Sequence, residues 1–119
     1  MKIAVSSTGT DLDSPIDPRF GRAPYLVVVD PQTLDFEVVD NAANMNAAKG
    51  AGIQAAASVS QKGANALLTG YCGPKAFQAL TAAGIKVAND VSGTVRDAVA
   101  SYNDGRLSFA DNPNVDGHW

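Results

Sequence analysis

Short apolar strands alternate with helices from residue 51 onwards. Strands are predicted over residues 65–70 and 85–88, and each precedes a stretch with apolar residues at helical spacing. The apolar stripes are Ile53, Ala56 and Ala57 in the first helix, Ala76, Ala79, Leu80 and Ala83 in the second, and Val95, Ala98, Val99 and Tyr102 in the third. Glycines stand where the three patterns stop, which is typical of helix C-termini. Strands joined through helices usually run parallel, so this rhythm predicts an α/β domain with parallel strands at its centre.

The first half of the chain adds a strand, a long loop and a hairpin. Residues 2–7 (KIAVSS) predict a buried strand, and the loop that follows is long enough to favour a functional role. The β-rich stretches at 25–30 and 35–40 flank a turn begun by an Asp-Pro pair, so we expect them to form a hairpin. Residues 107–110 are expected to add a short edge segment. The whole pattern predicts one three-layer α/β/α domain over residues 1–119, with the hairpin at one edge of the sheet.

The composition limits the classes of protein to consider. Of the 119 residues, 45% are apolar and 18% are charged, which is typical of a globular domain rather than a disordered chain. No apolar run approaches the ~20 residues that span a membrane, and no signal peptide is recognisable, so a cytoplasmic protein is expected. A net charge of −3 disfavours nucleic acid as a partner, because non-specific binding to it requires a basic face. The single cysteine rules out an internal disulfide framework.

The turn TGYCGPKA joins a predicted strand to a predicted helix and has the outline of an anion site. Gly73 and Pro74 suit the N-cap and the first helical position, because proline lacks only an N–H that would be unpaired there. The N–H groups of Lys75, Ala76 and Phe77 are then expected to point outward, beside the positive end of the helix dipole. The turn therefore predicts a place where an anion could bind.

Two other loops carry basic residues that could join this turn. Arg19 and Arg22 follow the first predicted strand, and Lys49 precedes the first predicted helix. If the strands end on one side of the sheet, these side chains and Lys75 would bring four cations to one cleft. Taken singly, each is more commonly a solvated surface charge. The neighbouring residues that would admit or contact a bulky ligand are Gly50, Gly52 and Met45.

Other functions remain as alternatives to an anion site. The field at the helix N-terminus would lower the pKa of the Cys72 thiol and favour either thiolate chemistry or a soft metal–sulfur contact. A thiol enzyme would also need a base, and none stands near Cys72 in the sequence. Cys72 could equally be a small apolar filler. A metal-dependent nuclease needs carboxylates on core strands, and Asp11, Asp13 and Asp17 suit turns and caps better. No Walker A or G-x-G-x-x-G motif follows a strand, whereas a pure protein-interaction module stays open.

Three stretches of the sequence resemble the dinitrogenase iron–molybdenum cofactor biosynthesis family. They are DPRFGRAPYLVVVD, GAGIQAAASVSQKGANALLTGYCGPKAFQALTAAGIKV and SGTVRDAVASY, which together cover most of the chain. The resemblance implies a ribonuclease H-like α/β/α fold with a mixed five-stranded sheet, and a role as a carrier or chaperone of anionic metal–sulfur clusters. Within the family, the chain is most similar to stand-alone members from sulfate-reducing bacteria, which bind a molybdenum–copper sulfide cluster without covalent attachment.

The chain departs from some members of the family in its possible metal ligands. Relatives that serve nitrogenase often carry a histidine in the glycine-rich loop, where this sequence has Ala47, Ala48 and Lys49, and its only histidine is His118. Direct histidine ligation by that loop is therefore not expected. One cysteine, one histidine and two methionines cannot build a Cys/His cage for zinc or an iron–sulfur cluster. A bound cluster would bring its own sulfide and be held as an anion by helix N-termini and basic side chains.

The sequence and the resemblance together predict a non-enzymatic carrier of an anionic, molybdenum-containing metal–sulfide cluster, with no catalytic residue. The resemblance implies molybdenum–copper sulfide as the cofactor, with the iron–molybdenum cofactor or a precursor of it as the alternative. The residues expected to bind it are Arg19, Arg22, Met45, Lys49, Gly50, Gly52, Gly70, Tyr71, Cys72, Gly73, Pro74 and Lys75. Other proteins of a cofactor-assembly or regulatory complex are candidate partners, whereas nucleic acid and membranes are not expected.

Overall fold

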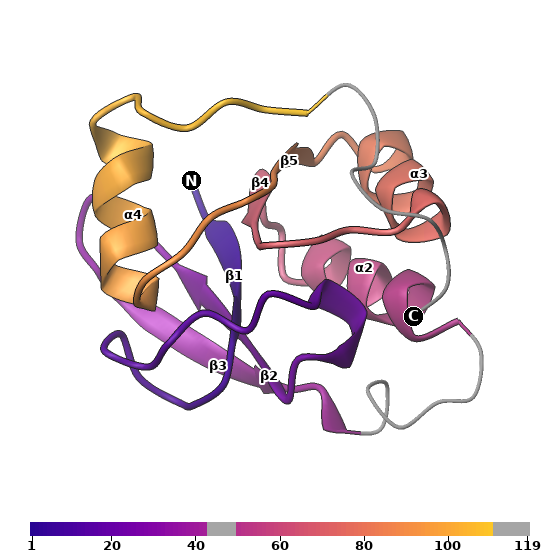
Figure 1. Cartoon of the computed structure of the whole chain (residues 1–119), viewed down its shortest axis with the longest axis horizontal. Coiled ribbons are helices and arrows are strands. Elements are labelled where there is room, and N and C mark those ends of the chain that lie inside the picture. Colours follow the sequence, from indigo (N-terminus) through magenta and orange to yellow (C-terminus); the bar gives the residue numbers. More distant parts are fainter. Residues whose placement is uncertain (43–49, 111–119) are drawn as a thin grey trace.

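The computed structural model describes residues 1–42 and 50–110, which form a five-stranded mixed sheet with helices on both faces (Figure 1). The strands are β1 (Ile3–Ser7), β2 (Tyr25–Val29), β3 (Phe36–Asp40), β4 (Ala66–Leu68) and β5 (Lys86–Ala88). The α-helices in these ranges are α2 (Ala51–Gln61), α3 (Pro74–Ala82) and α4 (Val95–Asn103), and a short 3-10 helix, η1 (Phe20–Arg22), interrupts the loop after β1. None of these helices has the length and apolar character that crossing a membrane requires.

The order of the strands across the sheet is β3-β2-β1-β4-β5, so β1 lies at its centre. β1 is parallel to β4, and β4 is parallel to β5, so these three strands end at the same edge of the sheet. β2 is antiparallel to β1, and β2 and β3 form the hairpin predicted from the sequence. The N–H groups of Asp30 and Leu34 close its turn by donating to the carbonyls of Asp35 and Asp30, both at 2.8 Å.

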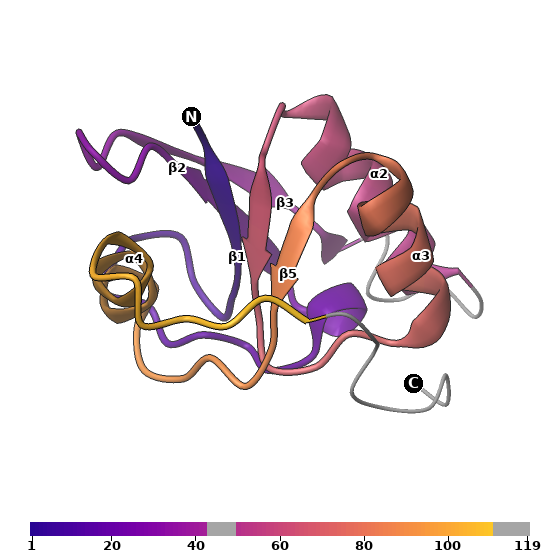
Figure 2. The same cartoon turned by 90° about the horizontal axis from the view of Figure 1, so that it is seen from above.

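Figure 2 shows the three layers, with α4 on one face of the sheet and α2 and α3 on the other. Neighbouring residues of β1 point to opposite faces, as the strand pleat requires. Ala4 belongs to the buried cluster beneath α2 and α3, whereas Ile3 and Val5 belong to the cluster beneath α4. Burial of apolar surface on both faces stabilises the sheet, and the predicted three-layer architecture is confirmed.

The sequence offers Ser92 or Thr94 as the N-cap of α4, and the structure shows that it is Thr94. The Thr94 hydroxyl accepts a hydrogen bond from the Asp97 N–H at 3.1 Å, and the Asp97 carboxylate accepts one from the Thr94 N–H at 3.0 Å. This reciprocal pair is a capping box, which satisfies two donors that the start of a helix leaves open. Val95, Ala98 and Val99 face the core as predicted.

α2 turns a different face to the core from the one predicted. Its buried residues are Ala51, Ala55, Ala56 and Val59. The prediction is wrong for Ile53, which is 43% exposed, and for Ala57, which is also exposed. Small side chains, rather than the largest one, face the sheet and α3, because the two helices lie close together. In α3 the prediction holds for Ala76 and Leu80 but is wrong for Ala83, which is exposed just beyond the last turn.

Residues 107–110 run beside β5 without forming a strand. The Ala110 N–H donates to the Val87 carbonyl at 2.7 Å, and this is the one backbone hydrogen bond that the described part of this segment makes to β5. The predicted edge segment is therefore present as a neighbouring chain but not as a sixth strand.

Candidate functional site

Two loops meet at the edge where β1 and β4 end. Residues 8–24 follow β1 and residues 69–73 follow β4. The Tyr71 N–H donates to the Pro18 carbonyl at 2.6 Å, and the Phe20 N–H donates to the Tyr71 carbonyl at 3.3 Å. Arg19 and Tyr71 thus lie side by side in a short parallel bridge. The loop of residues 8–24, which we call the arginine loop, and the turn of residues 69–73 are therefore in direct contact, and the sequence predicted both in one site.

A buried polar network fixes the arginine loop onto the ends of the strands. The Ser6 hydroxyl donates to the Asp17 carbonyl at 2.6 Å and lies 2.8 Å from the Thr69 hydroxyl. The Asp17 N–H in turn donates to the Ser6 carbonyl at 3.0 Å. All three residues are buried, so their hydrogen bonds are protected from water. Sequence reasoning assigned no structural role to Ser6 or Thr69, although both are polar residues at the ends of apolar strands.

Asp17 also holds Arg19 in place. Its carboxylate accepts hydrogen bonds from the Arg19 N–H at 2.9 Å and from the Arg19 Nε at 3.5 Å. The Asp17 side chain is 6% exposed and the Arg19 side chain 56% exposed, so the guanidinium extends to the surface from a buried anchor. The turn role predicted for Asp17 is confirmed. Its negative charge also offsets part of the charge of Arg19.

Three glycines allow backbone segments around the site to touch, and we call them the glycine contacts (Gly21, Gly52 and Gly70). A Cβ atom on Gly70 would lie 2.7 Å from the Pro18 Cα, and one on Gly21 would lie 2.7 Å from the Gly52 nitrogen. A Cβ atom on Gly52 would lie 2.9 Å from the Ala76 Cβ. The loop after β1, the start of α2 and the start of α3 are therefore packed against one another. Gly52 was expected to admit a ligand, but its lack of a side chain instead lets α2 approach α3.

The N-terminus of α3 leaves two backbone donors open at this edge. Gly73 is the N-cap without a side-chain cap, Pro74 occupies the first turn, and no acidic residue follows in that turn. Within the described ranges, the N–H groups of Lys75 and Ala76 donate no hydrogen bond. The prediction is wrong for Phe77, because its N–H donates to the Gly73 carbonyl at 2.9 Å and begins the helical series. Two N–H groups and the exposed Lys75 ammonium thus remain for an anion.

Cys72 is not the activated thiol that its position suggested. The residue is fully buried in the core beneath α2 and α3, and its Sγ lies 3.8 Å from the Gly73 carbonyl oxygen. Burial raises the pKa of the Cys72 thiol from 9.0 to about 12, so the expected lowering by the helix dipole is wrong. A neutral thiol adds no negative charge to the site, and it is a poor nucleophile.

The remaining predicted residues are divided between the described and undescribed parts of the chain. Gly50 is the N-cap of α2 with a φ of 75°, a left-handed conformation that favours glycine. Arg22 is the last residue of η1 and is partly buried. Met45 and Lys49 lie outside the described residues. Within residues 1–42 and 50–110, no three His, Cys, Asp or Glu side chains group as a metal site.

The buried thiol predicts a specific chemical behaviour. Iodoacetamide should alkylate Cys72 much more slowly in the folded protein at neutral pH than after unfolding in urea, as followed by mass spectrometry. Because the folded pKa lies above the unfolded one, the stabilising effect of the neutral thiol is complete below pH 9.0 and is lost as the pH rises toward about 12. Cys72→Ala should remove this part of the alkaline stability loss. Equal alkylation rates in the folded and unfolded states would contradict the burial.

Comparisons with known proteins place these features among characterised structures. Residues 1–105 match the sequence model of the family described as dinitrogenase iron-molybdenum cofactor. The apo form of the orange protein from Desulfovibrio gigas is 53% identical over 96% of each chain, with a TM-score of 0.93. A Thermotoga structure assigned to a NifB protein is 36% identical over 91% of each chain, with a TM-score of 0.78.

More distant similarity concerns the fold alone. A structure assigned to a dinitrogenase from Methanocaldococcus jannaschii is 19% identical over 95% of this chain and 97% of its own, with a TM-score of 0.70. No curated protein sequence matches the chain. The five-stranded mixed sheet with helices on both faces is therefore shared across widely diverged sequences.

Proposed function

The chain belongs to the dinitrogenase iron–molybdenum cofactor family, and from this premise we propose that it carries an anionic metal–sulfide cluster. The resemblance predicted from the sequence, to the family and within it to the stand-alone orange protein, is confirmed. The cluster is the cargo of the protein, held without covalent attachment at the edge where β1 and β4 end.

The observation that carries this proposal is the open N-terminus of α3 beside the arginine loop. Two N–H groups, on Lys75 and Ala76, which donate to no described residue, lie at the positive end of the helix dipole, and Lys75 adds a full charge. Arg19 lies next to Tyr71 in the adjoining loop. Anions are held in this way when the protein supplies donors and charge rather than metal ligands.

The scarcity of metal-ligating side chains among the described residues supports a cluster that already contains sulfide. The described residues offer no group of three metal-ligating side chains, and the thiol of Cys72 is buried and neutral. A metal ion stripped of its sulfide would find few ligands among them, whereas a preformed anionic cluster needs only positive potential and space. Arg22, Gly70, Tyr71, Gly73, Pro74 and the N-cap of α2, Gly50, complete the proposed site. Met45 and Lys49, which lie outside the described residues, belong to the proposal on the basis of the sequence. Gly52 contributes indirectly, by letting α2 approach α3.

The resemblance to the orange protein supports a choice of cluster. We favour molybdenum–copper sulfide, and the iron–molybdenum cofactor or a precursor of it is the alternative. The chain acts as a cytoplasmic, non-enzymatic carrier in this proposal, and its partners are other proteins of a cofactor-assembly or regulatory complex. A thiol enzyme would need an ionised Cys72, which the raised pKa of that thiol disfavours.

The proposal is tested by comparing two single substitutions in the turn before α3. Cys72→Ser should still take up a preformed molybdenum–copper sulfide cluster, because the charges and N–H groups supply most of the binding. Gly73→Val should lose most of the cluster, since a branched side chain would crowd the helix N-terminus. The backbone of Gly73 is extended, with a φ of −72°, so valine there causes no backbone strain.

Bound molybdenum and copper are measured after desalting, and circular dichroism checks that both variants are folded. Complete loss of metal in Cys72→Ser with normal loading in Gly73→Val would make Cys72 the anchor and overturn the electrostatic site. A wild-type protein that takes up no metal under any condition would overturn the carrier function itself.

A further inference from the structure

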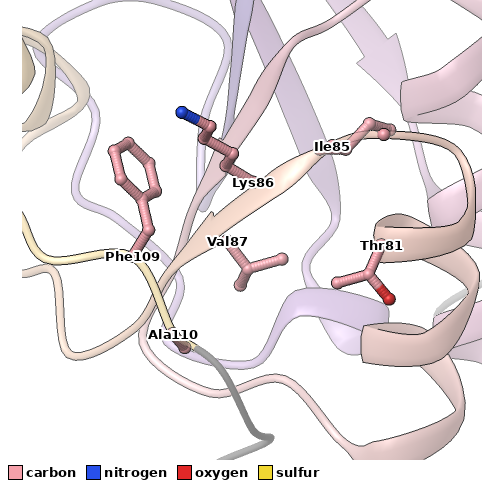
Figure 3. Close-up of a pocket in the computed structure, with 7 residues that line it drawn as sticks. Thr81, Ile85, Lys86, Val87, Phe109 and Ala110 are labelled. Carbon is pink, nitrogen blue, oxygen red and sulfur yellow. The ribbon is translucent and has the colours of Figure 1, made fainter.

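A groove lies beside the edge strand β5, at the opposite end of α3 from the proposed cluster site (Figure 3). It has a volume of about 380 Å³. The last turn of α3 supplies Thr81, the edge strand and the residue before it supply Ile85 and Val87, and the segment 107–110 supplies Phe109 and Ala110. In Figure 3 the side chains of Thr81 and Val87 enter the space between helix and strand.

The edge of β5 that borders the groove is only partly paired. The Lys86 N–H donates to the Asn65 carbonyl and the Ala88 carbonyl accepts from the Thr69 N–H, so both residues pair toward β4. In a parallel ladder the residue between them points its N–H and carbonyl to the other side. The Val87 carbonyl accepts from the Ala110 N–H at 2.7 Å, and the Val87 N–H has no hydrogen-bond partner in residues 1–42 and 50–110.

Phe109 and Ala110 form one wall of the groove and directly precede residues 111–119 in the sequence. Phe109 packs edge-on against Tyr102, with ring centroids 6.4 Å apart, and the Lys86 ammonium lies 5.5 Å from the centre of the Phe109 ring. Phe109 nevertheless remains 39% exposed. An exposed aromatic ring and an open edge amide beside a groove indicate a surface that another segment can cover.

We propose that this groove is the docking site of the chain's own segment 111–119, with the Trp119 indole as the group that fills it. The segment directly follows Ala110, which itself lines the groove, so docking requires closure of only a short loop. Its nine residues could extend to roughly 30 Å, ample for a return to the groove. Trp119 is its largest apolar side chain, and Asp111 and Asp116 carry charge opposite to that of Lys86.

The lone tryptophan of the chain makes this proposal directly measurable. In the folded chain, Trp119 should emit at shorter wavelength than free N-acetyltryptophanamide and should be quenched by acrylamide several-fold less efficiently. Thr81→Glu should restore quenching and shift the emission to longer wavelength, because it places bulk and negative charge in the groove. Gln78→Glu is the matched control, since it makes the same charge on the exposed side of α3 without lining the groove.

Each alternative result contradicts the proposal. Equal quenching of Trp119 and the free model compound would show that the indole is not docked. Protection that persists in Thr81→Glu, with circular dichroism and thermal midpoint unchanged, would place the indole elsewhere. Protection that disappears on dilution would indicate that a second copy of the chain fills the groove.

Discussion

Replacing Gly21 with alanine should lower the free energy of unfolding by about 1–3 kcal/mol, because the new methyl group has no room. A Cβ atom there would lie 2.7 Å from the Gly52 nitrogen and 2.8 Å from its Cα. Both atoms belong to the backbone at the start of α2, so no side-chain rotation can relieve the overlap. Urea denaturation of the empty protein measures the change, and cluster loading should fall with it because η1 moves away from α2.

Ala57→Val is the control for this substitution. Ala57 lies in α2, the helix that Gly21 contacts, and is exposed to solvent. Valine there should lower the free energy of unfolding by only a fraction of a kcal/mol, through its weaker helix propensity. Loading should stay normal in this variant. If Gly21→Ala unfolds at the same urea concentration as the wild type, the glycine contacts do not determine the packing of the site.

Lys75→Glu should weaken retention of the cluster by about tenfold or more, equivalent to at least about 1.4 kcal/mol. The substitution replaces an attraction by a repulsion at the N-terminus of α3, where two N–H groups find no partner within residues 1–42 and 50–110. A carboxylate in the first turn of a helix favours the fold, so the empty variant should be as stable as the wild type or more so. Binding and stability are therefore expected to change in opposite directions, which separates loss of the site from loss of the fold.

Lys62→Glu provides the same charge change away from the site. Lys62 is the C-cap of α2, at the other end of that helix from the site, so the substitution should leave loading nearly unchanged. It also breaks an exposed ion pair with Glu37 at 3.4 Å, which should cost little stability. The difference between the two variants should shrink as salt is added, because salt screens exposed charges. Equal loading of both variants at low salt would show that net charge, rather than the α3 terminus, governs binding.

The sequence predicted the strands, the hairpin and the helix ends because each depends on residues close together in the chain. The capping box of Thr94 and Asp97 and the turn begun by Asp30 are local features of this kind. The buried face of α2 was predicted wrongly because Ile53 is the most apolar residue in its first turn. Which face is buried depends on what α2 packs against, and small residues are required there by the approach of α3.

The candidate site was predicted in part, for similar physical reasons. The contact between the Arg19 loop and the Tyr71 turn followed from the rule that parallel strands end at one edge of a sheet. The raised pKa of the Cys72 thiol could not be predicted from the sequence. A thiol pKa depends on burial as well as on the helix dipole, and the burial of Cys72 is a property of the tertiary structure. The network of Ser6, Asp17 and Thr69 likewise joins residues whose adjacency only the folded sheet creates.

The glycine contacts also determine at which stage of synthesis and folding the site forms. Gly21 touches Gly52, Gly52 touches Ala76, and Gly70 touches Pro18, so each contact joins segments far apart in the sequence. Such long-range contacts form late, because closing large loops costs entropy before the contacts compensate. A chain still on the ribosome therefore has no site until α3 has been synthesised. Cargo that binds only the finished fold would stabilise it by mass action, so that loaded molecules survive proteolysis longer than empty ones.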